Sequence, residues 1–134
     1  MLNKCRVLLV DDHGLIREAL RSVLAAYDDL QIIGEAGDGK QAIEMTASCQ
    51  PDVILMDLNM PNMNGIEAAK YIKKSWKETV IVGLCTVQDP YTMEAFLKAG
   101  AVGVVSKVRL GDLYSTIQRA CIKISPLPSD RLSS

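Results

Sequence analysis

The sequence predicts one α/β domain in which helices cover both faces of a five-stranded parallel sheet. A chain of 134 residues is long enough for a single domain with one core. Its content of 49% hydrophobic and 23% charged residues is typical of a globular protein. Short apolar segments alternate five times with segments whose apolar residues recur at helical spacing, which indicates repeated β–α units.

Each predicted element of the first half has a local pattern of its own. The first strand is apolar and ends at Asp11 and Asp12. The second leads to Asp38, which caps the next helix with Gln41 as its capping-box partner. The third is an apolar run into Asp57, typical of a strand buried on both faces. The predicted strands are residues 5–10, 30–36, 53–56, 80–85 and 102–106, and the predicted helices are residues 13–26, 38–48, 64–75, 90–99 and 110–124.

The second half continues the alternation. Asn64 and Glu67 repeat the capping-box pattern at the start of the third helix. Pro90 suits the first turn of the fourth helix, and Gly100 suits its end. The fifth strand ends at Ser106, before a last helix with apolar residues on one side. Five such units fit the doubly wound, flavodoxin-like strand order 2-1-3-4-5.

Composition and charge exclude several classes of protein. A net charge of −1 and a pI near 5.8 argue against a domain that grips nucleic-acid phosphates. No apolar run approaches the roughly 18 residues of a membrane span. The apolar part of the first ten residues is too short for a signal peptide. We therefore expect a cytoplasmic protein with no membrane partner.

The four cysteines give no pattern of a metal site. Cys5, Cys49, Cys85 and Cys121 contain no C-x-x-C pair, and the sequence has one histidine, so a zinc site is not expected. In a cytoplasmic protein we expect four reduced thiols, most of them filling the core.

Polar side chains gather where the predicted strands end. Taken alone, Asp57 could simply cap the following turn. However, carboxyl ends of parallel strands meet at one edge of a sheet, where such folds bind ligands. Clustered carboxylates repel one another unless a cation intervenes, and hard oxygen ligands suit Mg²⁺. A metal, an ammonium group and a nucleophilic carboxylate together favour phosphoryl transfer. The side chains expected at this edge are Asp11, Asp12, Asp57, Cys85, Thr86, Ser106 and Lys107.

Three motifs identify a resemblance to a known family. They are residues 8–12, residues 56–65 and residues 99–103, the last leading into Lys107. Over about residues 4–124 the chain resembles the CheY-like receiver domain of two-component response regulators. Residues 11–20 are similar to the NarL/FixJ (LuxR-type) subfamily of transcriptional regulators.

The resemblance implies a role for each site residue. Asp57 would accept a phosphoryl group from a sensor histidine kinase. Asp12 and Asp57 would bind Mg²⁺ by carboxylate, Asn59 by its backbone carbonyl, and Asp11 through a water. Lys107 would pair with Asp57 and then with the phosphoryl oxygens. The resemblance implies a switch that catalyses its own phosphorylation and dephosphorylation, rather than an enzyme acting on another substrate.

The sequence departs from the family pattern at several positions. The switch Ser/Thr position falls on Cys85, whose thiol is a weak hydrogen-bond donor. A slip of the strand by one residue would instead bring in Thr86, and we favour Cys85 because a slip exchanges the two faces. Val104 stands at the position of the family's switch aromatic residue. Val108 stands where many members have a proline joined to the lysine by a cis peptide bond, and because a cis bond before a non-proline residue is costly, we do not expect that loop geometry here. In the family, the side chain two positions after the switch residue tunes the access of water to the phosphoryl group. Here that residue is Val87, which cannot position a water, so we expect a phosphoryl group lasting longer than seconds.

Two other functions are alternatives to this one. An aspartate-nucleophile phosphohydrolase usually has a second Asp two residues after its nucleophile, where this chain has Asn59. An inert receiver used as a binding module would lack one of the acids or the lysine, all of which are present.

We expect a receiver domain over residues 1–124 and a linker or disordered tail over residues 125–134. A DNA-binding output domain beyond that tail and homodimerisation on phosphorylation complete the prediction.

Overall fold

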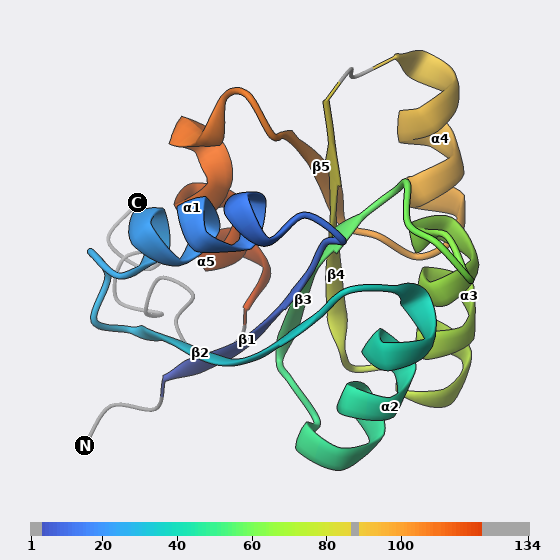
Figure 1. Ribbon diagram of the computed structural model, residues 1–134, viewed down its shortest axis with the longest axis horizontal. Coiled ribbons are helices and arrows are strands. Elements are labelled where there is room, and N and C mark those ends of the chain that lie inside the picture. Colours follow the sequence, from blue (N-terminus) through green and yellow to red (C-terminus); the bar gives the residue numbers. More distant parts are fainter. Residues whose placement is uncertain (1–3, 87–88, 122–134) are drawn as a thin grey trace, which may run out of the picture.

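The computed structural model describes residues 4–86 and 89–121, which form one parallel sheet between two layers of helices (Figure 1). The observed strand order β2-β1-β3-β4-β5 confirms the predicted topology. The strands are β1 (Cys5–Val10), β2 (Leu30–Ala36), β3 (Val53–Asp57), β4 (Val80–Cys85) and β5 (Gly103–Ser106). The helices are α1 (Gly14–Leu24), α2 (Gly39–Cys49), α3 (Gly65–Ser75), α4 (Pro90–Lys98) and α5 (Leu113–Ala120), with a 3-10 turn η1 (Leu110–Asp112) before α5.

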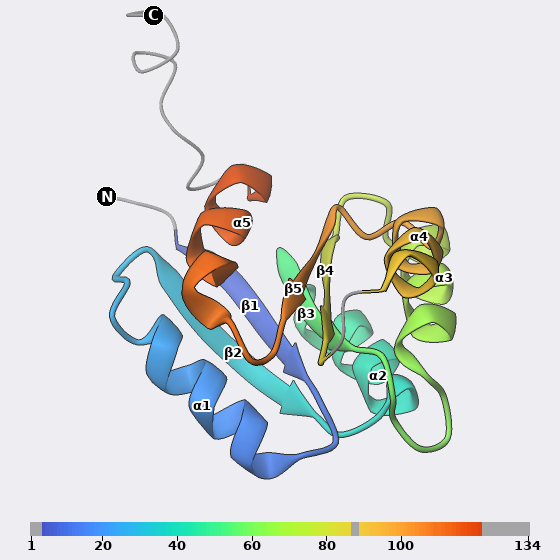
Figure 2. The same cartoon turned by 90° about the horizontal axis from the view of Figure 1, so that it is seen from above.

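The helices divide between the two faces of the sheet. Helices α1 and α5 cover one face, and α2, α3 and α4 cover the other (Figures 1 and 2). The cluster beneath α1 and α5 contains Leu9 and Leu55, whereas the cluster beneath α2, α3 and α4 contains their neighbours Leu8 and Ile54. Successive strand residues point to opposite faces, so these inner strands feed both clusters. All five residues of β3 are buried, as its apolar sequence predicts.

Polar caps fix the starts of several helices. The Asn64–Glu67 capping box at α3 is confirmed in full. Asp38 caps α2 by accepting the Gln41 amide, as predicted, but the Gln41 side chain accepts from the amide of Gly37. The prediction of a complete box there was therefore wrong by one residue. The amide of Gly37 takes the place of the N-cap amide as the donor to Gln41, so both hydrogen bonds still stabilise the start of α2.

The observed boundaries differ slightly from those predicted. Helix α1 starts one residue after His13, which is its N-cap. The predicted last helix divides into η1 and α5, and its expected residues 122–124 lie outside the described part of the chain. The expected tail, residues 125–134, also lies outside it. Across residues 4–86 and 89–121, every helix is too short or too polar to span a bilayer.

Candidate functional site

The predicted site lies at the carboxyl edge of the sheet. Asp11 follows β1 and is fully buried, while Asp57 is the last residue of β3 and is 3% exposed. Lys107, directly after β5, reaches both: its Nζ lies 2.6 Å from Asp11 Oδ2 and 2.7 Å from Asp57 Oδ1. A hollow of about 260 Å³ opens in front of Asp57. It is lined by His13, Asp57, Leu58, Asn59, Cys85, Thr86, Asp89, Thr92 and Lys107.

Burial and neighbouring charges have opposing effects on the pKa of Asp57. Burial raises the pKa of this carboxyl above its usual value, against the opposing effect of its bond with Lys107. The negative charges of Asp11 and Asp12 raise it further. Burial alone would lower the pKa of Lys107, but its bonds with Asp11 and Asp57 raise it overall. Lys107 is therefore a charged group that holds the two buried carboxylates together.

The donor atoms at this edge fit a hard cation. One ligand atom from each of Asp11, Asp12, His13 and Asp57 lies within 4.8 Å of the others. The buried Oδ2 of Asp57 has no hydrogen-bond partner among the described residues. A buried, unbonded carboxylate oxygen is costly, and a cation would satisfy it. Asn59 lines the same hollow, and the binding of Mg²⁺ by its backbone carbonyl stays a prediction.

His13 contacts both members of the acid pair, which the sequence did not predict. The predicted first helix begins at His13, and the structure makes this residue the N-cap of α1. Its ring Nδ1 also lies 3.0 Å from Asp12 Oδ1 and 3.2 Å from Asp11 Oδ1, and its amide donates to Asp11. Its position directly after the acid pair was the signal that could have found this contact.

The loop after β3 is held tightly behind the site. The Gly65 amide donates to the Leu58 carbonyl oxygen at 2.8 Å. A Cβ atom at Gly65 would lie 2.0 Å from the Asp57 carbonyl oxygen, so only glycine fits there. Farther along the loop, Asn62 adopts a left-handed conformation and donates to Asp38 at 2.9 Å. These contacts fix the backbone that carries Asp57.

Cys85 and Thr86 both line the hollow. Cys85 ends β4 in register with Ser106 of β5 and is almost completely buried, whereas Thr86 is exposed. Burial raises the pKa of the Cys85 thiol, and so does the charge of Asp89. The thiol is therefore protonated at neutral pH. Which of the two side chains contacts a phosphoryl group stays a prediction.

The other departures from the family pattern have clear structural positions. Val104 is half-buried and packs against the cluster beneath α4. Val108 is 71% exposed, and no peptide bond in the described residues is cis, so the Lys107–Val108 bond is trans. Val87, on which the predicted phosphoryl lifetime rests, lies outside the described residues.

Besides His13, the sequence reasoning missed two further polar residues of the hollow, Asp89 and Thr92. Asp89 caps α4, accepting from the amide and the hydroxyl of Thr92 at 2.9 and 2.8 Å. These bonds lower the pKa of Asp89. An Asp before Pro90, three positions ahead of a Thr, is a helix-start signal that could have placed both residues here.

Comparison with known proteins gives a consistent result. A family model described as the response regulator receiver domain matches residues 7–118. The chain is 46% identical over 106 residues to the uncharacterized transcriptional regulatory protein YxjL of Bacillus subtilis strain 168. That alignment covers 78% of this chain and 48% of the relative. The chain spans about half the length of the curated relatives that it matches.

Solved structures share the fold over most of the chain. The response regulator domain of Thermotoga maritima CheB matches with a TM-score of 0.81 and 33% identity, covering 88% of this chain and 96% of that one. The signal receiver domain of the response regulator NarL from Mycobacterium tuberculosis matches with a TM-score of 0.79 and 30% identity. That match covers 88% of this chain and 97% of the NarL domain.

Proposed function

The chain belongs to the response regulator receiver domain family, and we propose that Asp57 is its phosphoacceptor. The single observation that carries the proposal is the position of the Asp57 carboxylate. One oxygen contacts Lys107 at 2.7 Å, and the other has no hydrogen-bond partner among the described residues. The carboxylate thus lines the hollow and keeps an oxygen that no described group occupies.

The transfer needs the charges that surround this carboxylate. The bond between phosphorus and the donor nitrogen breaks as a bond to the Asp57 oxygen forms, and the donor nitrogen keeps the electron pair. Lys107 lies close enough to neutralise the phosphoryl oxygens as they arrive. Asp12 and Asp57 would hold Mg²⁺ by carboxylate, Asn59 by its carbonyl and Asp11 through a water. When bound, Mg²⁺ supplies further charge neutralisation.

The partners follow from the family and its relatives. The donor in the cytoplasm would be the phosphohistidine of a sensor histidine kinase. We propose that residues 1–124 are the receiver and that residues 125–134 link it to a DNA-binding output domain, since the alignments cover only about half of relatives that are transcriptional regulators. Phosphorylation would promote homodimerisation and so control that output.

A true hydrolase is less well supported. Asn59, two residues after Asp57, is an amide and cannot act as a general acid. We propose that the chain catalyses only its own phosphorylation and dephosphorylation. An inert binding module is favoured only by the departure at Cys85, whereas the acid pair, Asp57 and Lys107 all meet at one edge of the sheet.

The test is intact-protein mass spectrometry after incubation with phosphoramidate and Mg²⁺. We expect one added phosphoryl group that requires Mg²⁺ and is absent in Asp57→Asn. Asp28→Asn is the matched control, because Asp28 is an exposed aspartate outside the site. Unchanged phosphorylation of Asp57→Asn would overturn the assignment. The decay of the added mass would measure the phosphoryl lifetime, predicted to exceed seconds.

A further inference from the structure

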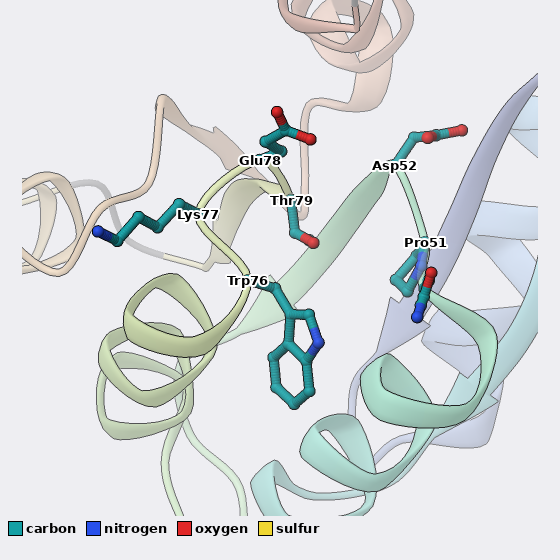
Figure 3. Close-up of a pocket in the computed structure, with 7 residues that line it drawn as sticks. Pro51, Asp52, Trp76, Lys77, Glu78 and Thr79 are labelled. Carbon is teal, nitrogen blue, oxygen red and sulfur yellow. The ribbon is translucent and has the colours of Figure 1, made fainter.

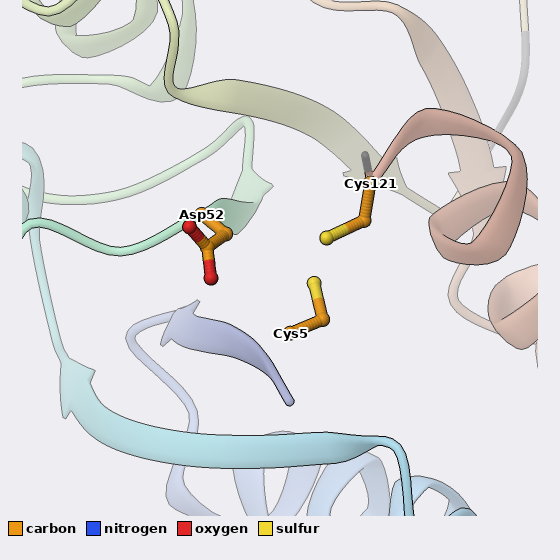
Figure 4. A group of neighbouring side chains, drawn as sticks. All are labelled: Cys5, Asp52 and Cys121. Carbon is orange, nitrogen blue, oxygen red and sulfur yellow. The ribbon is translucent and has the colours of Figure 1, made fainter. Parts of the chain in front are cut away.

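A second group of potential metal ligands lies at the amino end of the sheet. Cys5 starts β1, Asp52 immediately precedes β3, and Cys121 is the C-cap of α5. One ligand atom from each lies within 4.8 Å of the others. Figure 4 shows the two sulfur atoms close together and pointing toward each other, with the Asp52 side chain to one side of them. The fold thus joins the beginning and the end of the described domain at one point.

Burial sets these thiols apart from an accidental surface pair. Cys5 is fully buried and Cys121 is 2% exposed. Asp52 is half-buried, and its Oδ2 accepts the backbone amide of Arg6 at 2.9 Å, which orients the carboxylate. Asp52 also lines an adjacent hollow of about 330 Å³ beside Trp76 (Figure 3), so solvent reaches the edge of the cluster.

The donor chemistry differs from that of the phosphoacceptor site. The carboxyl edge offers carboxylate oxygens and one imidazole, a mainly hard set. The amino end offers two sulfurs and one oxygen, a set that suits borderline-soft divalent cations and not Mg²⁺. In tetrahedral zinc sites the metal–sulfur bond is about 2.3 Å, which places two sulfurs closer than about 4.6 Å. The cluster is compact enough to approach this arrangement.

We propose that Cys5, Asp52 and Cys121 form a second cation site, selective for a borderline-soft divalent metal of the Zn²⁺ class. Binding would release one proton from each thiol to solvent, so that both cysteines ligate as thiolates. The Asp52 carboxylate would be the third ligand, and a water would complete a tetrahedral set. The site does not depend on the proposed phosphorylation, because none of its ligands touches the Asp57 hollow.

The sequence pattern could not have revealed such a site. Metal motifs are recognised by short spacings between ligands, and these ligands come from three distant segments. The expectation that no zinc site is present rested on the absence of such short spacings and on the single histidine. A metal here would join the end of α5 to the starts of β1 and β3.

The test uses Co²⁺ as a spectroscopic probe for Zn²⁺ with the reduced full chain under anaerobic conditions. We expect a near-ultraviolet thiolate-to-cobalt absorption at one equivalent, and Zn²⁺ should abolish it by displacement. Cys121→Ser should lose the absorption, and Asp52→Asn should weaken Zn²⁺ affinity about 10-fold or more. Cys49→Ser and Asp57→Asn are the controls and should retain it, the second because it alters only the other site.

Several outcomes would overturn the proposal. The absence of thiolate absorption in the wild-type chain would do so, as would its persistence in Cys121→Ser. A mass loss of two hydrogens under mild peroxide, with no cobalt absorption, would show a disulfide pair instead of a metal site. If Cys121→Ser does not fold, Asp52→Asn and the wild-type melting temperature decide: Zn²⁺ should raise that temperature, and a chelator should reverse the rise.

Discussion

The two ends of the sheet are organised on opposite principles. At the carboxyl end, two buried carboxylates are held together by Lys107, and the pKa of Asp57 is raised by its burial. At the amino end, Tyr27 and Tyr114 stack with ring centroids 3.6 Å apart, and the Tyr114 hydroxyl donates to Asp29. The first end holds charged groups in a buried environment, and the tyrosine contacts of the second end contribute packing and a satisfied hydrogen bond. This contrast predicts that substitutions at the two ends affect different measurements.

The largest expected effect is on stability, at the loop that supports Asp57. Gly65→Ala would place a Cβ atom 2.0 Å from the Asp57 carbonyl oxygen, and a backbone neighbour cannot move away easily. We expect the free energy of unfolding to fall by about 3 kcal/mol. Gly111→Ala is the control, because nothing lies within 4 Å of the added atom. Denaturant unfolding that gives the two variants equal stability would refute this close contact.

The next effect should be confined to the chemistry of the carboxyl end. Lys107→Ala removes the cation closest to the Asp57 carboxylate, and we expect the rate of phosphorylation by phosphoramidate to fall about 100-fold. Lys77→Ala, an exposed lysine at the amino end, should leave the rate unchanged. The rate is measured by intact mass at saturating Mg²⁺. Equal rates in the two variants would break the contrast between the ends.

The amino end should respond in the opposite way. Tyr114→Phe removes the hydrogen bond to Asp29 but keeps the ring stack, and should lower the free energy of unfolding by about 1 kcal/mol without changing the phosphorylation rate. Tyr71→Phe, at an exposed tyrosine, is the matched control.

The same bond predicts a pH dependence of stability. Chiefly through the hydrogen bond with Asp29, the environment raises the pKa of Tyr114 to about 12, from about 10 in an unfolded chain. The contribution of the hydroxyl is therefore complete below pH 10 and is lost as the pH rises toward 12. The stability difference between wild type and Tyr114→Phe should shrink across that interval. A constant difference would mean that the hydroxyl does not carry the effect.

The smallest expected effect sharpens the description of the carboxyl end. Replacing the weakly donating Cys85 thiol by a hydroxyl in Cys85→Thr should strengthen the change that phosphorylation induces. The measurement is the difference in amide NMR shifts between the phosphorylated and unphosphorylated protein. Cys49→Thr, at a half-buried cysteine on α2, should leave that difference unchanged. An unchanged difference in Cys85→Thr would instead favour Thr86 as the contacting residue.

The sequence predicted those features that depend on neighbours along the chain. Alternating apolar segments gave the strand order, and the apolar run before Asp57 gave a strand buried on both faces. The meeting of Asp11, Asp57 and Lys107 followed from topology alone, because parallel strands bring their carboxyl ends together.

Features that depend on side-chain packing were not predictable in the same way. The stack of Tyr27 on Tyr114 and the approach of Cys5 to Cys121 join segments with no shared pattern. The choice between Cys85 and Thr86 depends on the local path of the chain after β4. The hydrogen bond from the Gly37 amide to the Gln41 side chain at the start of α2 depends on the conformation of that one side chain.

The link between the Asp57 loop and α2 has a consequence for how this protein can evolve. Asn62 donates to the same aspartate, Asp38, that caps α2, and the Gly39 amide donates to the Met63 carbonyl oxygen. A Cβ atom at Gly39 would lie 2.7 Å from that oxygen. Losing the Asp38 or the Asn62 side chain leaves its partner without this hydrogen bond, and a side chain at position 39 would crowd the Met63 carbonyl oxygen. Positions 38, 39 and 62 are therefore expected to constrain one another's evolution, although none of the three carries the chemistry.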